Sequence, residues 1–192
     1  MAEQRTKTGA ARADTLAIRG KLSDLYYFAY GSDMNAQQIT TRCAKPVAVG
    51  AARLAGYRLA FYGYSRTWDG GLETVVPDPG REVLGVLYAL NLADWERLDQ
   101  WWDVRLDGAG VYFHFPAAVA DTQGKTHTVL LYKKDDLSAP RPPSREYLDF
   151  IVQGGLERGL GADYLEELRR IESGKAQYDV PRRKKISLEF LA

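Results

Sequence analysis

An unbroken aromatic and apolar run opens the folded part of this chain: Leu25-Tyr26-Tyr27-Phe28-Ala29-Tyr30-Gly31-Ser32-Asp33-Met34. The run stops at a Gly-Ser-Asp turn, and a stretch of helical character, residues 35–43, follows at once. A buried strand that leads through a glycine turn into a helix leaves backbone N–H groups free, and the helix dipole favours negative charge there. The turn is therefore predicted to hold a carboxylate or phosphate. The simpler alternative is a tight turn that only leads out of a core strand.

Composition limits the class of protein. The chain has 192 residues, of which 45% are hydrophobic and 27% are charged, which is enough for one globular domain. The formal net charge of +1 gives no bulk attraction to nucleic acid or to a membrane, and no partner of either kind is expected. A small molecule is the expected partner.

Cysteine and histidine are scarce. The single cysteine, Cys43, excludes an internal disulfide and suits a reducing compartment, and two histidines make a zinc site improbable. No apolar run approaches membrane-spanning length, and residues 1–21 contain no apolar segment of the signal-peptide type. The expectation is a cytoplasmic protein without a metal or other cofactor.

Three segments are predicted along the chain. Residues 1–21 form a polar N-terminal tail, residues 22–172 form the folded domain, and residues 173–192 form a C-terminal extension. The extension carries the basic run Pro181-Arg182-Arg183-Lys184-Lys185, which is either a solvated tail or a surface for an interaction partner. A possible strand at 186–191 could pair with a second copy of the chain, so a homodimer is possible.

The folded domain is predicted to be rich in strands that cluster in sequence, which favours an α+β fold built on a small mixed β-barrel with flanking helices. Beyond the strand that ends at Tyr30, strands are expected at 48–54, 57–64, 73–76, 82–90, 111–119 and 126–132. Helices are expected at 35–43, at 91–101, after the capping residue Ser144, and at 162–171.

Six short motifs in order resemble one family, the γ-glutamylcyclotransferases. They are Phe28-Ala29-Tyr30-Gly31-Ser32-Asp33-Met34, Thr67-Trp68-Asp69-Gly70-Gly71-Leu72, Pro79-Gly80-Arg81-Glu82-Val83-Leu84-Gly85-Val86-Leu87-Tyr88, Leu98-Asp99, Pro142-Pro143-Ser144-Arg145-Glu146-Tyr147, and Gly159-Leu160 with Tyr164. Each motif alone is weakly specific, but their common order over roughly residues 25–172 makes a chance resemblance improbable.

The resemblance implies a small mixed barrel flanked by helices, and a reaction connected with glutathione metabolism. In that reaction the α-amine of a γ-glutamyl compound attacks its own γ-carbonyl and releases 5-oxoproline and an amine or amino acid. The substrate carboxylate would sit on the N–H groups of the turn, and a glutamate would act as general base. The substrate-binding residues expected on this basis are Tyr30, Gly31, Ser32, Asp33, Met34, Trp102 and Tyr147.

The first departure from the family pattern is at the position of the general-base glutamate. Where the resemblance expects L-D-x-x-E-G-V, this chain has Leu98-Asp99-Gln100-Trp101-Trp102-Asp103-Val104, so Trp102 stands in the place of the glutamate. Indole does not accept a proton at neutral pH. Asp103 is the first candidate for a substitute base. Glu73, which stands where the family has a small residue, is the second.

The second departure is Asp33, where the family has asparagine. Its carboxylate either faces the ligand and repels anions or caps the helix that starts at residue 35. The two departures leave two hypotheses open. The chain is either a γ-glutamylcyclotransferase with a relocated base or a non-catalytic member of the fold that binds a small molecule.

Overall fold

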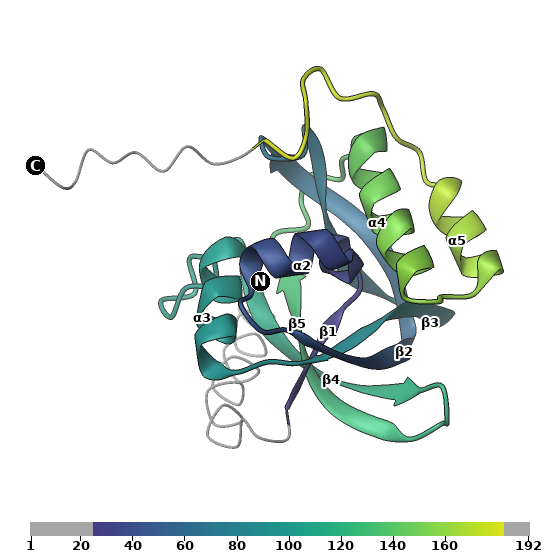
Figure 1. Cartoon of the computed structure of the whole chain (residues 1–192). Coiled ribbons are helices and arrows are strands. Elements are labelled where there is room, and N and C mark those ends of the chain that lie inside the picture. Colours follow the sequence, from purple (N-terminus) through teal and green to yellow (C-terminus); the bar gives the residue numbers. More distant parts are fainter. Residues whose placement is uncertain (1–24, 183–192) are drawn as a thin grey trace, which may run out of the picture.

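Five strands close into a mixed barrel, and the aromatic run forms the first of them (Figure 1). The computed structural model describes residues 25–182. The strands are β1 (Tyr26–Ala29), β2 (Val47–Ser65), β3 (Gly70–Ala89), β4 (Tyr112–Asp121) and β5 (Thr126–Lys134), and they lie in the order β1-β3-β2-β4-β5. β1 pairs antiparallel with β3 and parallel with β5, which closes the barrel. The predicted α+β barrel is confirmed.

The two longest strands correct the sequence prediction, which divided each of them into two. β2 runs on through Gly56 and β3 runs on through Gly80, and both glycines have positive φ, at +78° and +92°. Glycine enters this conformation without steric cost, so the chain bends or bulges there and the pairing continues. The hairpin of β2 and β3 therefore continues past these glycines and carries Glu73 and Phe61 as direct cross-strand partners.

The helices lie outside the barrel. They are a 3-10 turn η2 (Ser32–Met34), then α2 (Ala36–Arg42), α3 (Leu92–Trp101), α4 (Arg145–Glu157) and α5 (Ala162–Arg169). In Figure 1, α2 lies between α3 and α4, and α5 packs beside α4. Within residues 25–182, no helix has the length and apolar character needed to cross a membrane.

Side-chain caps fix where the helices begin. The side chain of Asn35 accepts a hydrogen bond from the backbone N–H of Gln38, and Asn91 and Ser144 play the same part for α3 and α4. Each cap satisfies an N–H group that has no partner inside the helix. The predicted capping role of Ser144 is confirmed.

The buried apolar residues form two clusters. One is drawn from the strands and from Tyr30, which follows β1; it includes Phe28, Tyr30, Val75 and Leu131. The other lies between the barrel and the helices. Because side chains alternate along a strand, Glu73 lies on the same side of β3 as Val75, toward the end of the barrel where β1 meets the Gly31 turn.

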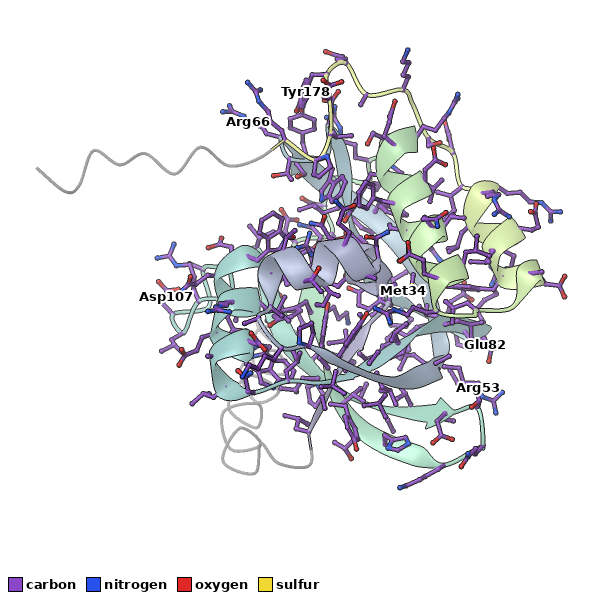
Figure 2. All side chains as sticks on the ribbon, viewed as in Figure 1. Met34, Arg53, Arg66, Glu82, Asp107 and Tyr178 are labelled. Carbon is purple, nitrogen blue, oxygen red and sulfur yellow. The ribbon has the colours of Figure 1, made fainter. Side chains whose placement is uncertain are left out.

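The described part of the C-terminal extension lies along the β2–β3 loop. The backbone N–H of Gln177 donates to the Asp69 carboxylate at 2.6 Å, and the Tyr178 hydroxyl donates to the Arg66 carbonyl at 2.7 Å (Figure 2). The N–H of Arg182 donates to Thr67. The predicted tail at residues 1–21, most of the basic run and the predicted strand at 186–191 lie outside the described residues.

Candidate active site

The glycine turn holds a carboxylate that belongs to the protein itself. Glu73 is 2% exposed, and its Oε1 accepts hydrogen bonds from the Ser32 backbone N–H at 3.1 Å and from the Ser32 hydroxyl at 3.3 Å. Its second oxygen, Oε2, is buried and has no hydrogen-bond partner among the described residues. A buried carboxylate oxygen without a donor is costly, so it marks a place where a donor from outside the protein fits.

Gly31 is required for this close approach. A Cβ atom at this position would lie 2.6 Å from the Cγ of Glu73 and would overlap the carboxylate. The φ of Gly31 is −130°, so the requirement is for space and not for a left-handed backbone. The glycine singled out in the sequence therefore serves the contact between the turn and Glu73.

Burial tunes the acidity of this carboxyl group. Removal from water raises the pKa of Glu73 to about 7, while the hydrogen bond from Ser32 and the charge of Arg42 act in the opposite direction. Burial likewise raises the pKa of Tyr30 and of Tyr112 well above their ordinary value, so both phenols stay neutral. Among these groups, Glu73 is the one able to exchange a proton near neutral pH.

The Asp33 carboxylate is engaged inside the protein. Its carboxylate is 1% exposed, pairs with the Arg42 guanidinium, and accepts from the Tyr27 hydroxyl at 2.8 Å and from Trp102 Nε1 at 3.0 Å. Asn35, not Asp33, caps the following helix, so the predicted cap was wrong. Asp33 is a buried counter-ion inside the protein.

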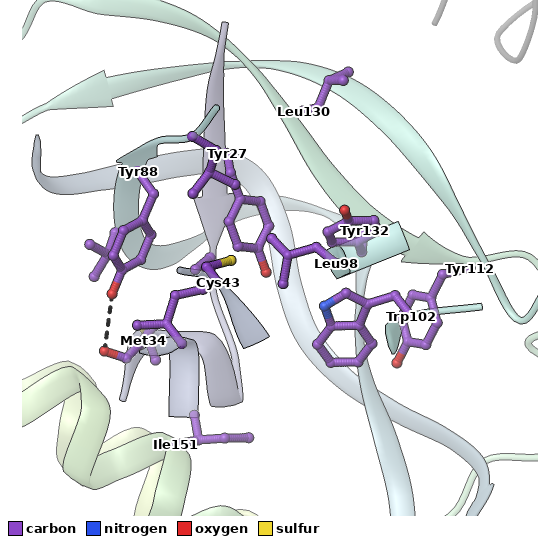
Figure 3. Packing of buried hydrophobic residues seen from close by; sticks show 14 of the residues in the cluster. Tyr27, Met34, Cys43, Tyr88, Leu98, Trp102, Tyr112, Leu130, Tyr132 and Ile151 are labelled. Atoms are coloured by element: carbon purple, nitrogen blue, oxygen red, sulfur yellow. Dashed lines mark hydrogen bonds between the residues drawn. The ribbon is translucent and has the colours of Figure 1, made fainter. Parts of the chain in front are cut away.

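Trp102 fills the position where the resemblance expects a glutamate. It follows the last turn of α3, is 5% exposed, and packs in a row with Tyr27, Tyr132 and Tyr112 (Figure 3). The indole N–H of Trp102 can only donate a hydrogen bond. The aspartate at position 33 offers two oxygens that accept, whereas the asparagine expected there from the resemblance would offer one. The two departures from the family pattern, at positions 33 and 102, therefore form one hydrogen-bonded unit.

Arg42 completes this unit, and no pattern in the sequence pointed to it. Its guanidinium pairs with Asp33 and lies 4.1 Å from the ring centre of Trp101 and 5.0 Å from that of Trp102. A buried guanidinium is stabilised by a counter-charge and by aromatic rings on which it can stack. Asp33 supplies the counter-charge, and Trp101 and Trp102 supply the rings.

Asp103, the first candidate for the base, lies at the surface. Its φ is +50°, and its Oδ2 accepts from the backbone N–H of Val111 at 3.3 Å. Aspartate tolerates the left-handed conformation better than most residues do, which explains how it stands where the family has glycine. The structure thus separates the two candidate acids: Glu73 is buried against the Gly31 turn, and Asp103 lies at the beginning of the following loop.

The remaining predicted binding residues line the core around this turn. The Tyr30 hydroxyl donates to the Tyr132 carbonyl, and the buried Met34 accepts with its carbonyl from the Arg158 guanidinium at 3.2 Å. Tyr147 is fully buried, stacks on Trp68 with ring centres 4.3 Å apart, and its hydroxyl has no partner among the described residues.

Two buried polar atoms near the candidate site lack a hydrogen-bond partner among the described residues: Glu73 Oε2, an acceptor, and the Tyr147 hydroxyl, which can donate. Phe61 is the cross-strand partner of Glu73, and its ring centre lies 6.2 Å from that of Tyr147.

A cavity of about 430 Å³ is lined by the β2–β3 loop, the end of α3 and the start of β4, and neither Glu73 nor Tyr147 is among its lining residues. Leu72, Trp102 and Tyr112 belong to its wall. Leu72 precedes Glu73 in β3, so the two side chains lie on opposite sides of the strand, and the Tyr112 hydroxyl donates to the Glu73 backbone carbonyl at 2.6 Å. The volume is in the range of small-molecule pockets, about 300–1,000 Å³.

The fold is a mixed five-stranded barrel with flanking helices, and the model of the AIG2-like family matches residues 82–168. The γ-glutamylcyclotransferase of Homo sapiens is 34% identical over 150 residues, which cover 76% of this chain and 78% of that protein, and the Mus musculus protein is equally similar. A solved γ-glutamyl cyclotransferase superposes with a TM-score of 0.75 at 32% identity, covering 81% of this chain and 92% of that one. The chain belongs to the γ-glutamylcyclotransferase family.

Proposed function

We propose that this protein converts a γ-glutamyl compound to 5-oxoproline, with Glu73 as the general base. The observation that carries the proposal is the buried Oε2 of Glu73 beside the Gly31 turn, which has no hydrogen-bond partner in the described part of the chain. The relatives named γ-glutamylcyclotransferase support the reaction class. The base stands on β3 in this chain, because Trp102 fills the position of the family glutamate.

The reaction needs one proton acceptor and one intramolecular attack. The substrate α-amine donates a hydrogen bond to Glu73 Oε2 and loses a proton to it, and its nitrogen forms a bond to the γ-carbon. The bond from that carbon to the leaving nitrogen breaks as this nitrogen takes up a proton from Glu73. A base whose pKa is about 7 suits both transfers at neutral pH.

The neighbouring groups position the substrate. Because Ser32 donates its N–H to Glu73, the substrate carboxylate is assigned to the adjacent N–H groups of Gly31 and Asp33. The unpartnered hydroxyl of Tyr147 is assigned to the γ-carbonyl oxygen, where negative charge develops. Held in this curled form, the glutamyl arm closes its ring in a unimolecular step.

The test is the release of 5-oxoproline from a panel of γ-glutamyl dipeptides and γ-glutamylamines. Wild type is expected to form product, and Glu73→Gln to lower kcat/KM by about 10²–10⁴-fold. Glu82→Gln is the matched control, because Glu82 lies on the same strand but is exposed and pairs with Arg53 at 3.7 Å (Figure 2). Wild type that forms no 5-oxoproline from any substrate removes the proposal.

The second candidate is a non-catalytic member of the fold that binds a small molecule. Two observations favour it: Trp102 occupies the position of the family base, and Glu73 takes the N–H of Ser32. Calorimetric binding of a γ-glutamyl compound that leaves it intact over hours, in the presence of correctly folded protein, would select this function over the first.

The proposal also covers the cellular compartment and the partners of the protein. The single cysteine, Cys43, is buried and unpaired, which suits the reducing cytoplasm. A small γ-glutamyl compound is the proposed partner, without nucleic acid or membrane. The homodimer stays a prediction, to be tested by sedimentation of the full chain.

A further inference from the structure

The Ser32 hydroxyl lies between the candidate base and a buried cation. It donates to Glu73 Oε1 at 3.3 Å, and the Arg42 guanidinium donates to it at 3.4 Å. The side chains of all three residues are buried. A continuous chain of hydrogen bonds therefore runs from α2, through the turn η2, to the carboxyl group on β3.

Several contacts hold the guanidinium in this place. Arg42 belongs to the last turn of α2 and pairs with Asp33, which accepts from Trp102 Nε1 at 3.0 Å. Gln38 lies one turn earlier on the same helix. With its amide oxygen turned toward Arg42, it accepts from Nε at 3.2 Å and from Nη2 at 2.6 Å. A planar guanidinium that is bound on several sides has one orientation, so the N–H group that meets Ser32 is fixed.

The chemistry of arginine sets the direction of the hydroxyl proton. A guanidinium has donors and no acceptor, whereas a hydroxyl has one donor and two lone pairs that accept. Because Arg42 occupies a lone pair of the Ser32 hydroxyl, the proton of this hydroxyl is directed to the carboxylate. Glu73 Oε1 thus accepts twice from Ser32, from its hydroxyl and from its backbone N–H, while Oε2 accepts from no group within residues 25–182.

We propose, on the basis of the proposed function, that Arg42 is a positioning residue for the general base: it directs the Ser32 hydroxyl to Oε1 and so makes Oε2 the oxygen that takes up the substrate proton. An oxygen that already accepts two hydrogen bonds holds a proton less well. The proton of the substrate amine therefore goes to Oε2 and passes from Oε2 to the leaving nitrogen. Trp102, in the place of the family glutamate, supports the base on β3 through Asp33 and Arg42.

Arg42 and Asp33 also act on Glu73 through their charges, in opposite directions. Burial raises the pKa of Glu73 to about 7, and of the two neighbouring charges Arg42 lowers this pKa and Asp33 raises it. Removal of Arg42 and removal of the Asp33 charge are therefore expected to shift the pKa of Glu73 in opposite directions. Beside burial, the charge of Glu73 acts on the pKa of three groups from other elements: Tyr30 after β1, Tyr112 on β4 and Lys134 on β5.

The titration of Glu73 is measured without turnover, by the ¹³C signal of the side-chain carboxyl group in the full chain labelled at glutamate. Glu73→Gln assigns the signal. The midpoint in wild type is expected at about 7. Arg42→Met is expected to raise the midpoint and Asp33→Asn to lower it, each by on the order of one unit. A merely structural role of the ion pair would not shift the midpoint in opposite directions.

Ser32→Ala tests the link itself, because it removes the hydroxyl and keeps the Asp33–Arg42 ion pair and the backbone N–H. It is expected to raise the midpoint and to lower kcat/KM about tenfold. In this background, Arg42→Met shifts the midpoint less than in wild type. The matched control is Arg158→Met, which removes a cation that donates to the Met34 carbonyl of the same turn at 3.2 Å. It is expected to leave the midpoint unchanged.

The outcomes separate this proposal from the reaction itself. Wild-type midpoints in Arg42→Met and Ser32→Ala, or shifts of the same sign in Arg42→Met and Asp33→Asn, overturn the positioning role while the proposed function stands. An equal shift by Arg42→Met with and without the Ser32 hydroxyl shows action by charge alone and overturns the link. The expected shifts in a protein that forms no 5-oxoproline keep the arrangement around Glu73 and remove the proposed activity.

Discussion

At the scale of single residues, the proposed activity depends on one carboxyl group, that of Glu73. Glu73 is buried, and one of its carboxylate oxygens accepts hydrogen bonds from Ser32, whereas the other has no partner within residues 25–182. Such a group is unfavourable for folding when it is charged, and structures retain strained or unsatisfied groups of this kind at functional sites.

The stability of the protein is therefore expected to depend on pH through Glu73. Its pKa is about 7 in the folded state against an ordinary 4.5, so between these values the folded state binds one more proton than the unfolded state. The contribution is fully present below about pH 4.5 and is lost as the pH rises through about 7, a change on the order of 3 kcal/mol. Denaturant unfolding at several pH values, wild type against Glu73→Gln, measures it.

In that comparison, the free energy of unfolding of wild type relative to Glu73→Gln falls between pH 4.5 and 7 and is constant above. A difference in the free energy of unfolding that stays constant over this range would show that Glu73 keeps an ordinary pKa. That result would contradict a general base whose pKa lies near 7.

The buried unit of Asp33, Arg42 and Trp102 is a second residue-scale feature. Asp33→Asn leaves the Arg42 guanidinium buried without a counter-charge, and we expect a loss of about 3–5 kcal/mol in the free energy of unfolding. The control is Asp78→Asn, which breaks an exposed pair with Arg58 at 3.4 Å and is expected to cost less than about 1 kcal/mol. Equal losses in the two variants would contradict a buried ion pair at Asp33.

At the scale of the element, the connection from β1 into η2 and α2 has one position that accepts no side chain. Gly31→Ala places a methyl group against the Glu73 carboxylate, so the carboxylate must leave Ser32. We expect a loss of about 1–3 kcal/mol in stability, together with a fall in kcat/KM comparable to that of Glu73→Gln.

Gly50→Ala is the matched control for this prediction. Gly50 lies in β2, and a Cβ there meets no atom within 4 Å, so the change is expected to stay below about 1 kcal/mol. A Gly31→Ala protein that matches it in both stability and turnover would mean that the turn does not hold Glu73.

Elements were predictable from the sequence where local chemistry decides them. The aromatic run predicted β1, and the capping residues Asn35 and Ser144 predicted the starts of α2 and α4. Local signals failed at Gly56 and Gly80, which were interpreted as strand ends. A glycine with positive φ ends a strand or bends it depending on the pairing partner, and that partner is distant in sequence.

At the scale of the whole molecule, the site depends on contacts between distant parts of the chain. Trp102 and Asp33 are 69 residues apart, and Ser32 and Glu73 are 41 apart. The sequence identified Asp33, Glu73 and Trp102 separately through their departures from the family motifs. It did not show that two of them bind each other, because closure of the barrel creates that contact.

The C-terminal segment is a whole-molecule feature with its own prediction. A chain that ends at Glu172 lacks the bonds from Gln177 and Tyr178 to the β2–β3 loop, whereas a chain that ends at Arg182 keeps them. The shorter chain is expected to melt several degrees lower, at about 2–4 °C for each kcal/mol lost. Calorimetry of the two truncated chains measures this, and equal Tm values would show that the segment does not stabilise the loop.

The most direct test of the central claim is the pH dependence of 5-oxoproline formation. With Glu73 as base, kcat/KM rises with pH through an apparent pKa of about 7 in wild type, because the carboxyl group must be ionised to accept the proton. Glu73→Gln loses the activity, and Glu82→Gln keeps the wild-type profile. Full activity in Glu73→Gln, or a wild-type profile that shows no ionisation near pH 7, would contradict the account.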